Sequence, residues 1–342
     1  MKNIKKVRVE DAQGMVLVHD MTRIIPGKFK GVGFKKGHVV QKQDIPALLK
    51  LGKAHLYVLN LSAEQIHEDE AALAIAEAVC DKSLSFSTPS EGKSSIVAKT
   101  DGIVKIDTSG LLQINRIDDI IIATLKNNFP CKAGQTVAGT RIIPLIIARK
   151  KIERMQTIAA KYKPVLAVRP YRKLKVGAVV TGSELYNGLI KDEFDTYVGR
   201  KVKKYGSEVT EKIIVSDEPD QIAQAIKTVA ASGVDLILTT GGLSVDPDDV
   251  TRIGVKRAGA KVKFYGTPIL PGAMFLYAVL GNVPILGLPA CVYYHTTTIF
   301  DLVLPRVLAG EDIRKKDIAG LGHGGLCMNC EKCQYPVCPF GK

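Results

Sequence analysis

The segment with the richest chemistry runs from Thr239 to Thr251 and reads TTGGLSVDPDDVT. Its paired glycines, Gly241 and Gly242, have no side chains and let the backbone approach a ligand closely. A flanking hydroxyl, from Thr240 or Ser244, can hold a phosphate oxygen together with backbone amides near a helix start, where the peptide dipoles leave partial positive charge. The segment therefore predicts a loop that binds phosphate.

Two carboxylates in the same loop work against a phosphate. Asp248 and Asp249 would repel a bare anion, so they either cap the following helix or hold a divalent cation such as Mg²⁺, which prefers oxygen ligands. The sequence is compatible with both roles. They differ in whether the loop needs a metal ion to hold its ligand.

A second chemical group is the set of four cysteines near the carboxyl-terminal end, spaced C-x2-C-x2-C-x4-C-P. Its members are Cys327, Cys330, Cys333 and Cys338. Four thiolates can complete a tetrahedral Zn²⁺ site or bind a [4Fe–4S] cluster. The cysteine run of ferredoxins has one residue fewer before its last cysteine, so Zn²⁺ stays a candidate beside the cluster. Reactive thiols without a metal are the alternative. His323 is either a further ligand or an exposed loop histidine.

The elements that must position the glycine loop alternate between strand and helix. Apolar patterns predict strands at Leu174–Val180, Val209–Val215 and Asp235–Leu238, and helices at Thr196–Tyr205, at Pro219–Ala231 and from the glycine loop to Arg257. Such alternation predicts a parallel sheet covered on both faces. Ligands bind beyond the carboxyl ends of the strands in these sheets, so the loops after Val180 and Leu238 should form the site.

The first half of the chain has shorter apolar runs, broken by Gly and Pro. Residues 1–59 predict small strands ahead of a helix at Ile45–Leu51, and a capping box at Ser62 and Gln65 predicts a long helix to Cys80. A small β subdomain and a helix should follow, with strands at Ile103–Ile106, Ile120–Leu125 and Arg141–Ile147 and the helix at Met155–Lys163. Pro164 ends that helix, so a domain boundary is expected near Lys161–Leu174.

Composition limits the class of protein. The 342 residues are 46% hydrophobic and carry a formal net charge of +14 at pH 7. This length predicts two domains, and because no apolar run could span a bilayer we expect a soluble protein without a membrane partner. Basic residues are scattered and aromatic residues make up 6%, which argues against nucleic acid as a partner. Seven cysteines, four of them clustered, favour a reducing compartment and a cytoplasmic location.

Four segments resemble, in the same order, motifs of the molybdopterin-binding Mog and MoeA domains of molybdenum cofactor biosynthesis. TTGGLSVDPDDVT resembles their TTGG-and-Asp loop, and VVTGSEL at residues 179–185 resembles their strand and TGDEL turn. ILPG at residues 269–272 and GLP at residues 287–289 stand where MoeA-like proteins carry KPGKP and GLPGNP. The resemblance indicates a divergent MoeA relative, and we expect it to lack the carboxyl-terminal β domain because residues 311–342 carry the cysteines instead.

The resemblance implies a three-layer α/β/α Mog-like domain with a mostly parallel sheet at residues 164–310. A smaller MoeA-like region, α+β and β-rich, would precede it at residues 1–163, and a cysteine-rich tail would follow at residues 311–342. The implied ligand is molybdopterin or adenylylated molybdopterin. The implied transferase activity is either Mg-ATP-dependent adenylylation or insertion of molybdate, and the alternative is a non-catalytic carrier or sensor of the cofactor with a metal-binding tail.

Residue by residue, the resemblance assigns catalytic carboxylates that hold Mg²⁺ to Glu184, Asp235 and Asp249. The other matched positions would bind the pterin cofactor, and they are Thr181, Gly182, Ser183, Thr240, Gly241, Gly242, Ser244, Asp248, Pro271, Gly272, Gly287, Leu288 and Pro289. Molybdate would be the second small-molecule partner. Other cofactor-biosynthesis proteins, a molybdoenzyme or further copies of this chain would be the macromolecular partners.

The chain departs from the family pattern where MoeA-like proteins carry positive charge. Leu270 and Ala273 replace the two lysines of KPGKP, and residues 290–292 read ACV where GLPGNP has Gly, Asn and Pro. An anionic group in transfer normally needs such donors. The departures therefore weaken the expectation of MoeA-type turnover more than the expectation of binding.

Overall fold

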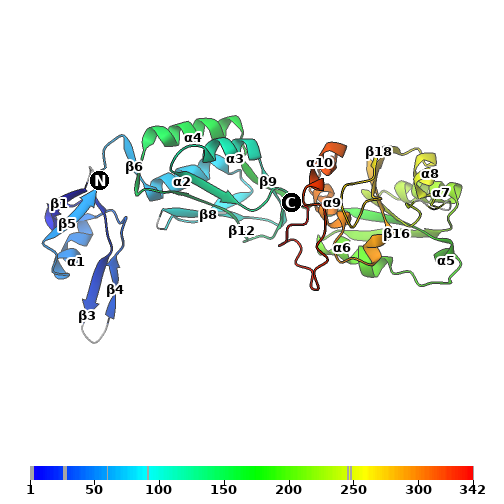
Figure 1. The fold of residues 1–342 in the computed structure, drawn as a ribbon, viewed down its shortest axis with the longest axis horizontal. Helices are drawn as coiled ribbons and strands as arrows, with labels where there is room; N and C mark the ends of the chain where they lie inside the picture. Colours follow the sequence, from blue (N-terminus) through cyan, green and yellow to red (C-terminus); the bar gives the residue numbers. More distant parts are fainter. Residues whose placement is uncertain are drawn as a thin grey trace. The chain divides into compact units, whose positions relative to one another are not determined.

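The chain divides into two compact units in a computed structural model that describes residues 4–25, 29–59, 61–90, 92–244, 246 and 249–341 (Figure 1). The first unit comprises Met1–Thr100, Val104–Asn127 and Cys131–Val168, and the second comprises Asp101–Ile103, Asn128–Pro130 and Arg169–Lys342. The cysteine-rich tail is therefore part of the second unit.

The second unit is built on a six-stranded sheet with the order β16-β15-β17-β20-β19-β18. The strands are β15 (Lys175–Thr181), β16 (Glu208–Val215), β17 (Leu236–Thr240), β18 (Lys261–Tyr265), β19 (Leu276–Leu280) and β20 (Val283–Leu288). β16, β15, β17 and β20 run parallel, whereas β19 runs antiparallel to both of its neighbours. The sheet is mostly parallel, as the sequence predicts.

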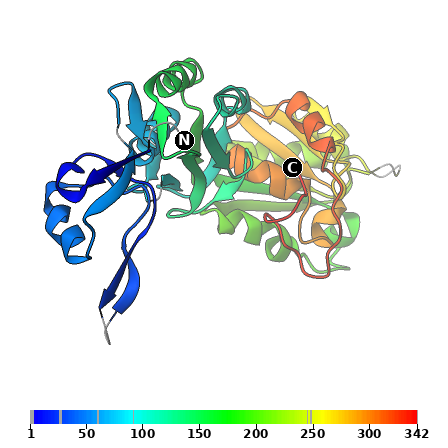
Figure 2. The same cartoon turned by 60° about the vertical axis from the view of Figure 1, so that its left-hand side comes forward.

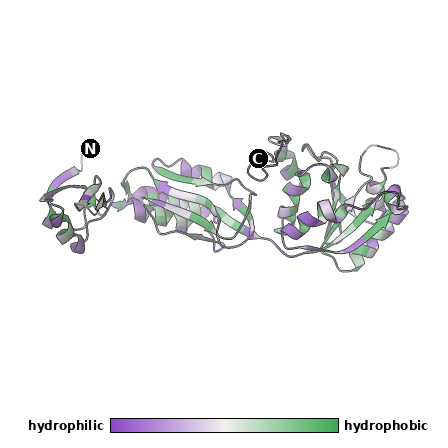
Figure 3. Ribbon diagram, turned by 90° about the horizontal axis from the view of Figure 1, so that it is seen from below, coloured by the Kyte–Doolittle hydropathy of each residue, from purple (hydrophilic) through white to green (hydrophobic). Residues whose placement is uncertain are grey.

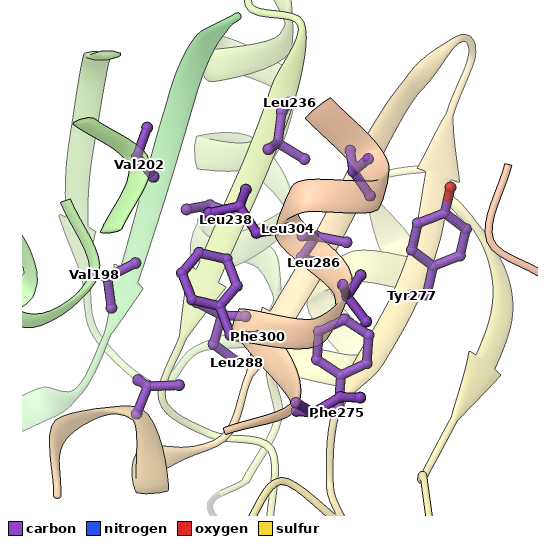
Figure 4. Close-up of a cluster of buried hydrophobic side chains, with 14 of the residues drawn as sticks. Val198, Val202, Leu236, Leu238, Phe275, Tyr277, Leu286, Leu288, Phe300 and Leu304 are labelled. Atoms are coloured by element: carbon purple, nitrogen blue, oxygen red, sulfur yellow. The ribbon is translucent and has the colours of Figure 1, made fainter. Parts of the chain in front are cut away.

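Helices cover both faces of this sheet. They are α5 (Ser183–Tyr186), the π-helical turn η3 (Asp195–Gly199) continued by α6 (Arg200–Lys204), α7 (Pro219–Ala231), α8 (Thr251–Arg257), η4 (Ala290–Tyr293), α9 (Ile299–Leu308), α10 (Lys315–Ala319) and η5 (Gly320–Gly322). On one face, Phe300 and Leu304 of α9 pack with Leu238 and Leu286 of the sheet (Figure 4). Figure 2 shows the same helix, in orange, against the strands. On the other face, α7 and α8 pack in a second apolar cluster. The three-layer α/β/α fold is confirmed.

The central strands are apolar on both faces because both faces are covered. In β15 every residue from Val176 to Thr181 is buried, and the hydrophobic colouring of such strands is visible in Figure 3. Alternate side chains separate into the two clusters, with Ala178 and Val180 facing α9 and Val179 facing α7. Gly177 also faces α7, where a Cβ atom would clash with Val229.

The first unit contains several small sheets. Its strands are β1 (Ile4–Arg8), β2 (Val16–Leu17), β3 (Met21–Ile25), β4 (Phe29–Phe34), β5 (His55–Leu59), β6 (Gln65–His67), β7 (Leu84–Phe86), β8 (Lys93–Ala98), β10 (Ile120–Thr124), β12 (Thr136–Ile142) and β13 (Ile146–Ala148). Its helices are η1 (Val9–Asp11), η2 (Lys42–Asp44), α1 (Ile45–Lys50), α2 (Glu68–Val79), α3 (Thr108–Asn115) and α4 (Arg149–Lys161). Three further strands, β9 (Gly102–Ile106), β11 (Pro130–Cys131) and β14 (Leu166–Pro170), contain the points where the chain passes between the units.

The prediction that one helix starts at Ser62 is wrong. The Ser62 amide does donate to the Gln65 side chain, at 3.3 Å, but residues Gln65–His67 form β6 and pair with β13. The helix begins at Glu68, and the ring of His67 accepts a hydrogen bond from the Asp69 amide at 3.3 Å. A partner strand some eighty residues away in sequence decides the start of this helix, and a local capping motif cannot report it.

Among the described residues, no helix has the length and apolar composition needed to cross a membrane.

The close contact at Gly177 gives a test of the packing. Gly177→Ala should lower the free energy of unfolding by about 1–3 kcal/mol, because an added methyl group overpacks the interface between β15 and α7. Urea denaturation followed by circular dichroism measures this change. Gly320→Ala is the matched control, since its Cβ would meet nothing within 4 Å, and equal destabilisation by the two substitutions would contradict the packing described.

Candidate functional site

Most of the predicted site residues lie at the end of the sheet where the parallel strands finish, which we call the carboxyl edge. Thr181, Val215, Thr240 and Leu288 end β15, β16, β17 and β20, which run in the same direction. The loops that follow these strands therefore emerge side by side. They carry the TGSEL turn, the glycine loop and the GLP turn that the sequence identifies.

The glycine loop packs tightly against the end of β15. A Cβ atom on Gly241, whose φ is +88°, would clash with the carbonyl oxygen of Thr181, and one on Gly242, whose φ is +56°, would lie 2.5 Å from Thr251 Oγ1. Both glycines are required here, because a side chain has no space and positive φ strains other residues. Gly182 at the end of β15 also has a positive φ, of 152°.

Two threonine hydroxyl groups link the end of β15, the glycine loop and the start of α8. Thr181 Oγ1 donates to the Thr240 carbonyl at 3.1 Å and lies 3.1 Å from Thr251 Oγ1. Thr251 Oγ1 also lies 2.9 Å from the Gly241 carbonyl oxygen, and the Thr251 amide donates to Gly242. The carbonyl oxygens of the turn are thus engaged inside the protein. The role of Thr251 was missed by the sequence reasoning, although it ends the recognised segment.

A positively charged side chain, that of Arg252, lies beside the same loop. Tyr265 donates a hydrogen bond from its hydroxyl to the Leu243 carbonyl, and the guanidinium of Arg252 lies 4.7 Å from the centre of the Tyr265 ring. This arrangement is a cation–π contact that holds Arg252 in the first turn of α8. Sequence reasoning did not single out Arg252, because the ring that holds it comes from β18.

Tyr293 ties the loop after β20 to the end of β17. Its hydroxyl donates to Thr240 Oγ1 at 3.0 Å, and its ring makes an edge-to-face contact with Tyr197. Burial raises the pKa of Tyr293 to about 12, so the phenol keeps its proton at neutral pH and acts as the donor. No local pattern in the sequence predicts this hydrogen bond, because Tyr293 and Thr240 lie 53 residues apart.

Ser183 binds a carboxylate that the sequence analysis overlooked. Asp217 Oδ2 accepts hydrogen bonds from the Ser183 amide at 2.7 Å and from the Ser183 hydroxyl at 2.9 Å. Asp217 follows β16, so the two loops join at the edge of the sheet. The feature of the sequence that could have identified Asp217 is its position just after a predicted parallel strand.

The three predicted catalytic carboxylates are not brought together. Asp235 precedes β17 and accepts a hydrogen bond from the Lys175 amide at 2.9 Å, whereas the glycine loop follows the same strand. Five residues of strand, about 16 Å at 3.3 Å per residue, separate the two ends. Asp235 therefore lies at the opposite edge of the sheet and fixes the start of β15.

Glu184 and Asp249 do lie at the carboxyl edge, after β15 and β17. Glu184 is exposed on α5. Asp249 closes a turn, because its carboxylate accepts from the Asp246 amide at 3.0 Å, and α8 begins at Thr251 without a side-chain cap. Asp248 lies outside the described residues.

The remaining predicted positions surround the same edge. Gly287, Leu288 and Pro289 are buried at the end of β20, whereas Ser244 is exposed. Pro271 accepts a hydrogen bond from the Ile299 amide at 3.2 Å, and a Cβ on Gly272 would clash with Ile299. The ILPG segment is therefore packed against the start of α9.

The ILPG segment also pairs with the cysteine-rich tail. The Leu270 amide donates to Gly325 and the Cys327 amide donates to Leu270, both at 2.8 Å. The four predicted cysteines, Cys327, Cys330, Cys333 and Cys338, all line one cavity of about 310 Å³. Within the described chain, no three His, Cys, Asp or Glu side chains form a ready-made group for a metal ion.

Family models match two parts of the chain. Residues 177–309 match a family described as a probable molybdopterin binding domain, and residues 6–60 match a domain of unknown function (DUF8806).

Curated relatives match parts of the chain. The chain is 32% identical over 161 residues to a molybdopterin molybdenumtransferase of Haemophilus influenzae, which covers 44% of this chain and 39% of the relative. It is 38% identical over 79 residues to a CinA-like protein of Fusobacterium nucleatum, covering 23% of this chain and 19% of the relative. The chain thus spans less than half the length of either relative.

Among solved structures, the molybdopterin biosynthesis enzyme MoaB of Thermus thermophilus is 22% identical, with a TM-score of 0.35, and covers 40% of this chain and 98% of that chain. The matched family model, the two-glycine loop and the ordered motifs around the sheet edge agree. Residues 177–309 therefore match a probable molybdopterin binding domain, and this part of the chain is similar to the Mog and MoeA-like family.

Proposed function

We propose that the second unit binds molybdopterin or adenylylated molybdopterin at the carboxyl edge of its sheet, as part of molybdenum cofactor biosynthesis. The observation that carries this proposal is the convergence of the TGSEL, glycine and GLP loops at one edge of the matched domain. A ligand bound there would meet the partly exposed backbone of Gly241 and Gly242 and the exposed hydroxyl of Ser244.

The electrostatics of the glycine loop suit an anionic ligand. Carbonyl oxygens of Thr240, Gly241 and Gly242 accept hydrogen bonds inside the protein, so they are already compensated when an anion approaches. Arg252 adds a positive charge beside the loop. A phosphate or phosphoanhydride is therefore the part of the ligand that this loop would hold.

The proposed activity is a transferase step on the pterin, either adenylylation with Mg-ATP or insertion of molybdate with release of AMP. Two carboxylates and substrate phosphates are a sufficient set for Mg²⁺, which keeps several of its waters. Glu184 and Asp249 would supply those carboxylates, because both follow neighbouring strands at the same edge. Asp235 does not fit this set.

A carrier or sensor of the cofactor is the second candidate. It is favoured by the ILPG segment, where the family lysines are replaced by Leu270 and Ala273 and the backbone of Leu270 pairs with the cysteine-rich tail. A loop without those cations can retain a ligand while giving less stabilisation to a developing anion. Self-association, contact with biosynthetic proteins or a molybdoenzyme, and a cytoplasmic location stay predictions.

The glycine loop provides the first test of binding. Gly241→Ala should weaken binding of molybdopterin at least tenfold in anaerobic titration calorimetry, because the methyl group would displace the loop from Thr181. Gly233→Ala is the matched control: Gly233 also has a positive φ, of 79°, but its Cβ would meet nothing within 4 Å. Equal affinities of the two variants would refute binding at this edge.

The hydrogen bond from Tyr293 to Thr240 provides the second test. Tyr293→Phe should raise the Kd for molybdopterin about five- to tenfold, since a lost hydrogen bond of about 1 kcal/mol loosens the junction between the two loops. Tyr294→Phe, at a neighbouring side chain that is 83% exposed, should leave the Kd unchanged. The same calorimetric titration compares them, and an unaltered Kd for Tyr293→Phe would exclude a role for this junction.

Release of AMP distinguishes a transferase from a carrier. With adenylylated molybdopterin, Mg²⁺ and molybdate, the wild-type chain should release AMP, and Asp249→Ala should slow the release at least tenfold. Asp235→Asn should retain the wild-type rate, because this residue lies at the other edge of the sheet. Chromatographic assay of AMP measures all three rates, and tight binding without AMP release would instead identify a carrier.

A further inference from the structure

The first unit contains a cavity of about 380 Å³, which we call the Glu68 cavity. Its lining includes Lys35 and Lys36 after β4, Glu68 at the start of α2, Arg141 in β12 and Leu145. Small-molecule sites in proteins typically have volumes of about 300–1,000 Å³. The Glu68 cavity is therefore large enough for a small organic ligand, and it belongs to a different unit from the carboxyl edge.

A buried carboxylate, that of Glu68, lies between two glycines at this cavity. Glu68 is 5% exposed, and its amide donates to the Leu145 carbonyl at 2.9 Å. A Cβ atom on Gly37 would lie 2.7 Å from Glu68 Oε1, and one on Gly92 would clash with Glu68 Oε2. Both glycines have positive φ, of 86° and 70°, a conformation that strains other residues. The backbone on both sides is thus shaped to leave room for the carboxylate.

The Glu68 carboxylate lacks a hydrogen-bond donor within the described ranges of the chain. Burial raises the pKa of Glu68 above its usual range, and the positive charges of Arg141 and Lys36 oppose this shift without cancelling it. A buried polar group in a native protein normally has a hydrogen-bond partner, because an unsatisfied one is costly. A ligand in the cavity that supplies N–H donors would provide that partner.

Two cations at the same cavity are available to an anionic group. Lys36 and Arg141 are exposed, and neither forms an ion pair with another residue that the structure describes. The Lys36 amide donates to Asp20 Oδ1 at 2.7 Å, and Arg141 Nε donates to the Ile142 carbonyl at 3.3 Å, so the protein fixes where both residues lie. Ammonium and guanidinium groups bind carboxylate and phosphate oxygens through charge-assisted hydrogen bonds.

We propose that the Glu68 cavity binds a small zwitterion, whose guanidinium- or amidine-type N–H pair donates to Glu68 and whose carboxylate or phosphate pairs with Lys36 and Arg141. The two oxygens of a carboxylate match two parallel N–H donors, so this contact also orients the ligand. A ligand with only one of these groups would leave either the buried carboxylate or the two cations without a partner. The inference does not rest on the proposed function, because the cavity and the carboxyl edge lie in different units.

Calorimetric titration of the full chain with two probes tests the class of ligand. 4-Guanidinobutyrate carries a guanidinium and a carboxylate on a flexible stem, whereas guanosine 5′-monophosphate carries a planar N–H pair and a phosphate. We expect at least one of them to bind with a Kd below about 1 mM. Butylguanidinium, which lacks the anion, and adenosine 5′-monophosphate, which lacks the same N–H pair, should bind at least tenfold more weakly than their matched probes. The tighter of the two probes identifies the form of the ligand.

Variants of the lining test the two contacts. Glu68→Gln keeps the size of the side chain but removes its negative charge, and Lys36→Met removes one cation, so each should raise the Kd of the bound probe at least tenfold. Lys50→Met is the matched control, because Lys50 is exposed on α1 outside the described lining, and it should keep the wild-type Kd.

Far-ultraviolet circular dichroism checks that each variant is folded, and Lys36→Met, at an exposed side chain, decides the outcome if Glu68→Gln does not fold. A Kd above about 1 mM for both probes would overturn the proposal. A wild-type Kd for a folded Glu68→Gln or for Lys36→Met would also overturn it, since the probe would then bind elsewhere on the chain.

Discussion

The close approach of the glycine loop to the end of β15 is the constraint on which the site depends. β15 and β17 are paired parallel neighbours, so the chain leaving Thr240 must turn within about one strand spacing, roughly 4.8 Å, of Thr181. Only a residue without a Cβ atom fits between the two, and Gly241 provides it. Thr251 then completes the turn with bonds to Gly241 and Gly242. The functional loop is thus shaped by packing before any ligand is present.

The parallel sheet concentrates polar chemistry at its carboxyl edge. Its central strands are buried on both faces, and the side chains there are almost all apolar. Polar groups that must lie close together are therefore found where the strands end, as in the pairs Ser183 with Asp217 and Thr240 with Tyr293. The opposite edge has a structural use, seen in the bond between Asp235 and the start of β15.

The spacing of apolar residues predicts the strands and helices of the second unit, but it does not predict contacts between residues that are distant in sequence. The helix at Pro219–Ala231 follows from a proline at its start and an apolar stripe, both of which are local. The links from Thr240 to Tyr293 and from Arg252 to Tyr265 depend on how strands pair, which no local pattern records. The placement of Asp235 was a different error, because a residue that opens a parallel strand must lie at the edge away from the loop that closes it.

The cysteine-rich tail contacts the segments around the carboxyl edge by two routes. Leu270 pairs with Gly325 and Cys327, and its neighbour Pro271 accepts from Ile299 at the start of α9. Tyr294 to Thr297 line the cavity that the four tail cysteines also line, while Tyr293 just before them binds Thr240. The tail therefore packs against the ILPG loop and against the segment that follows the GLP turn, so a substitution that displaces the tail would disturb both.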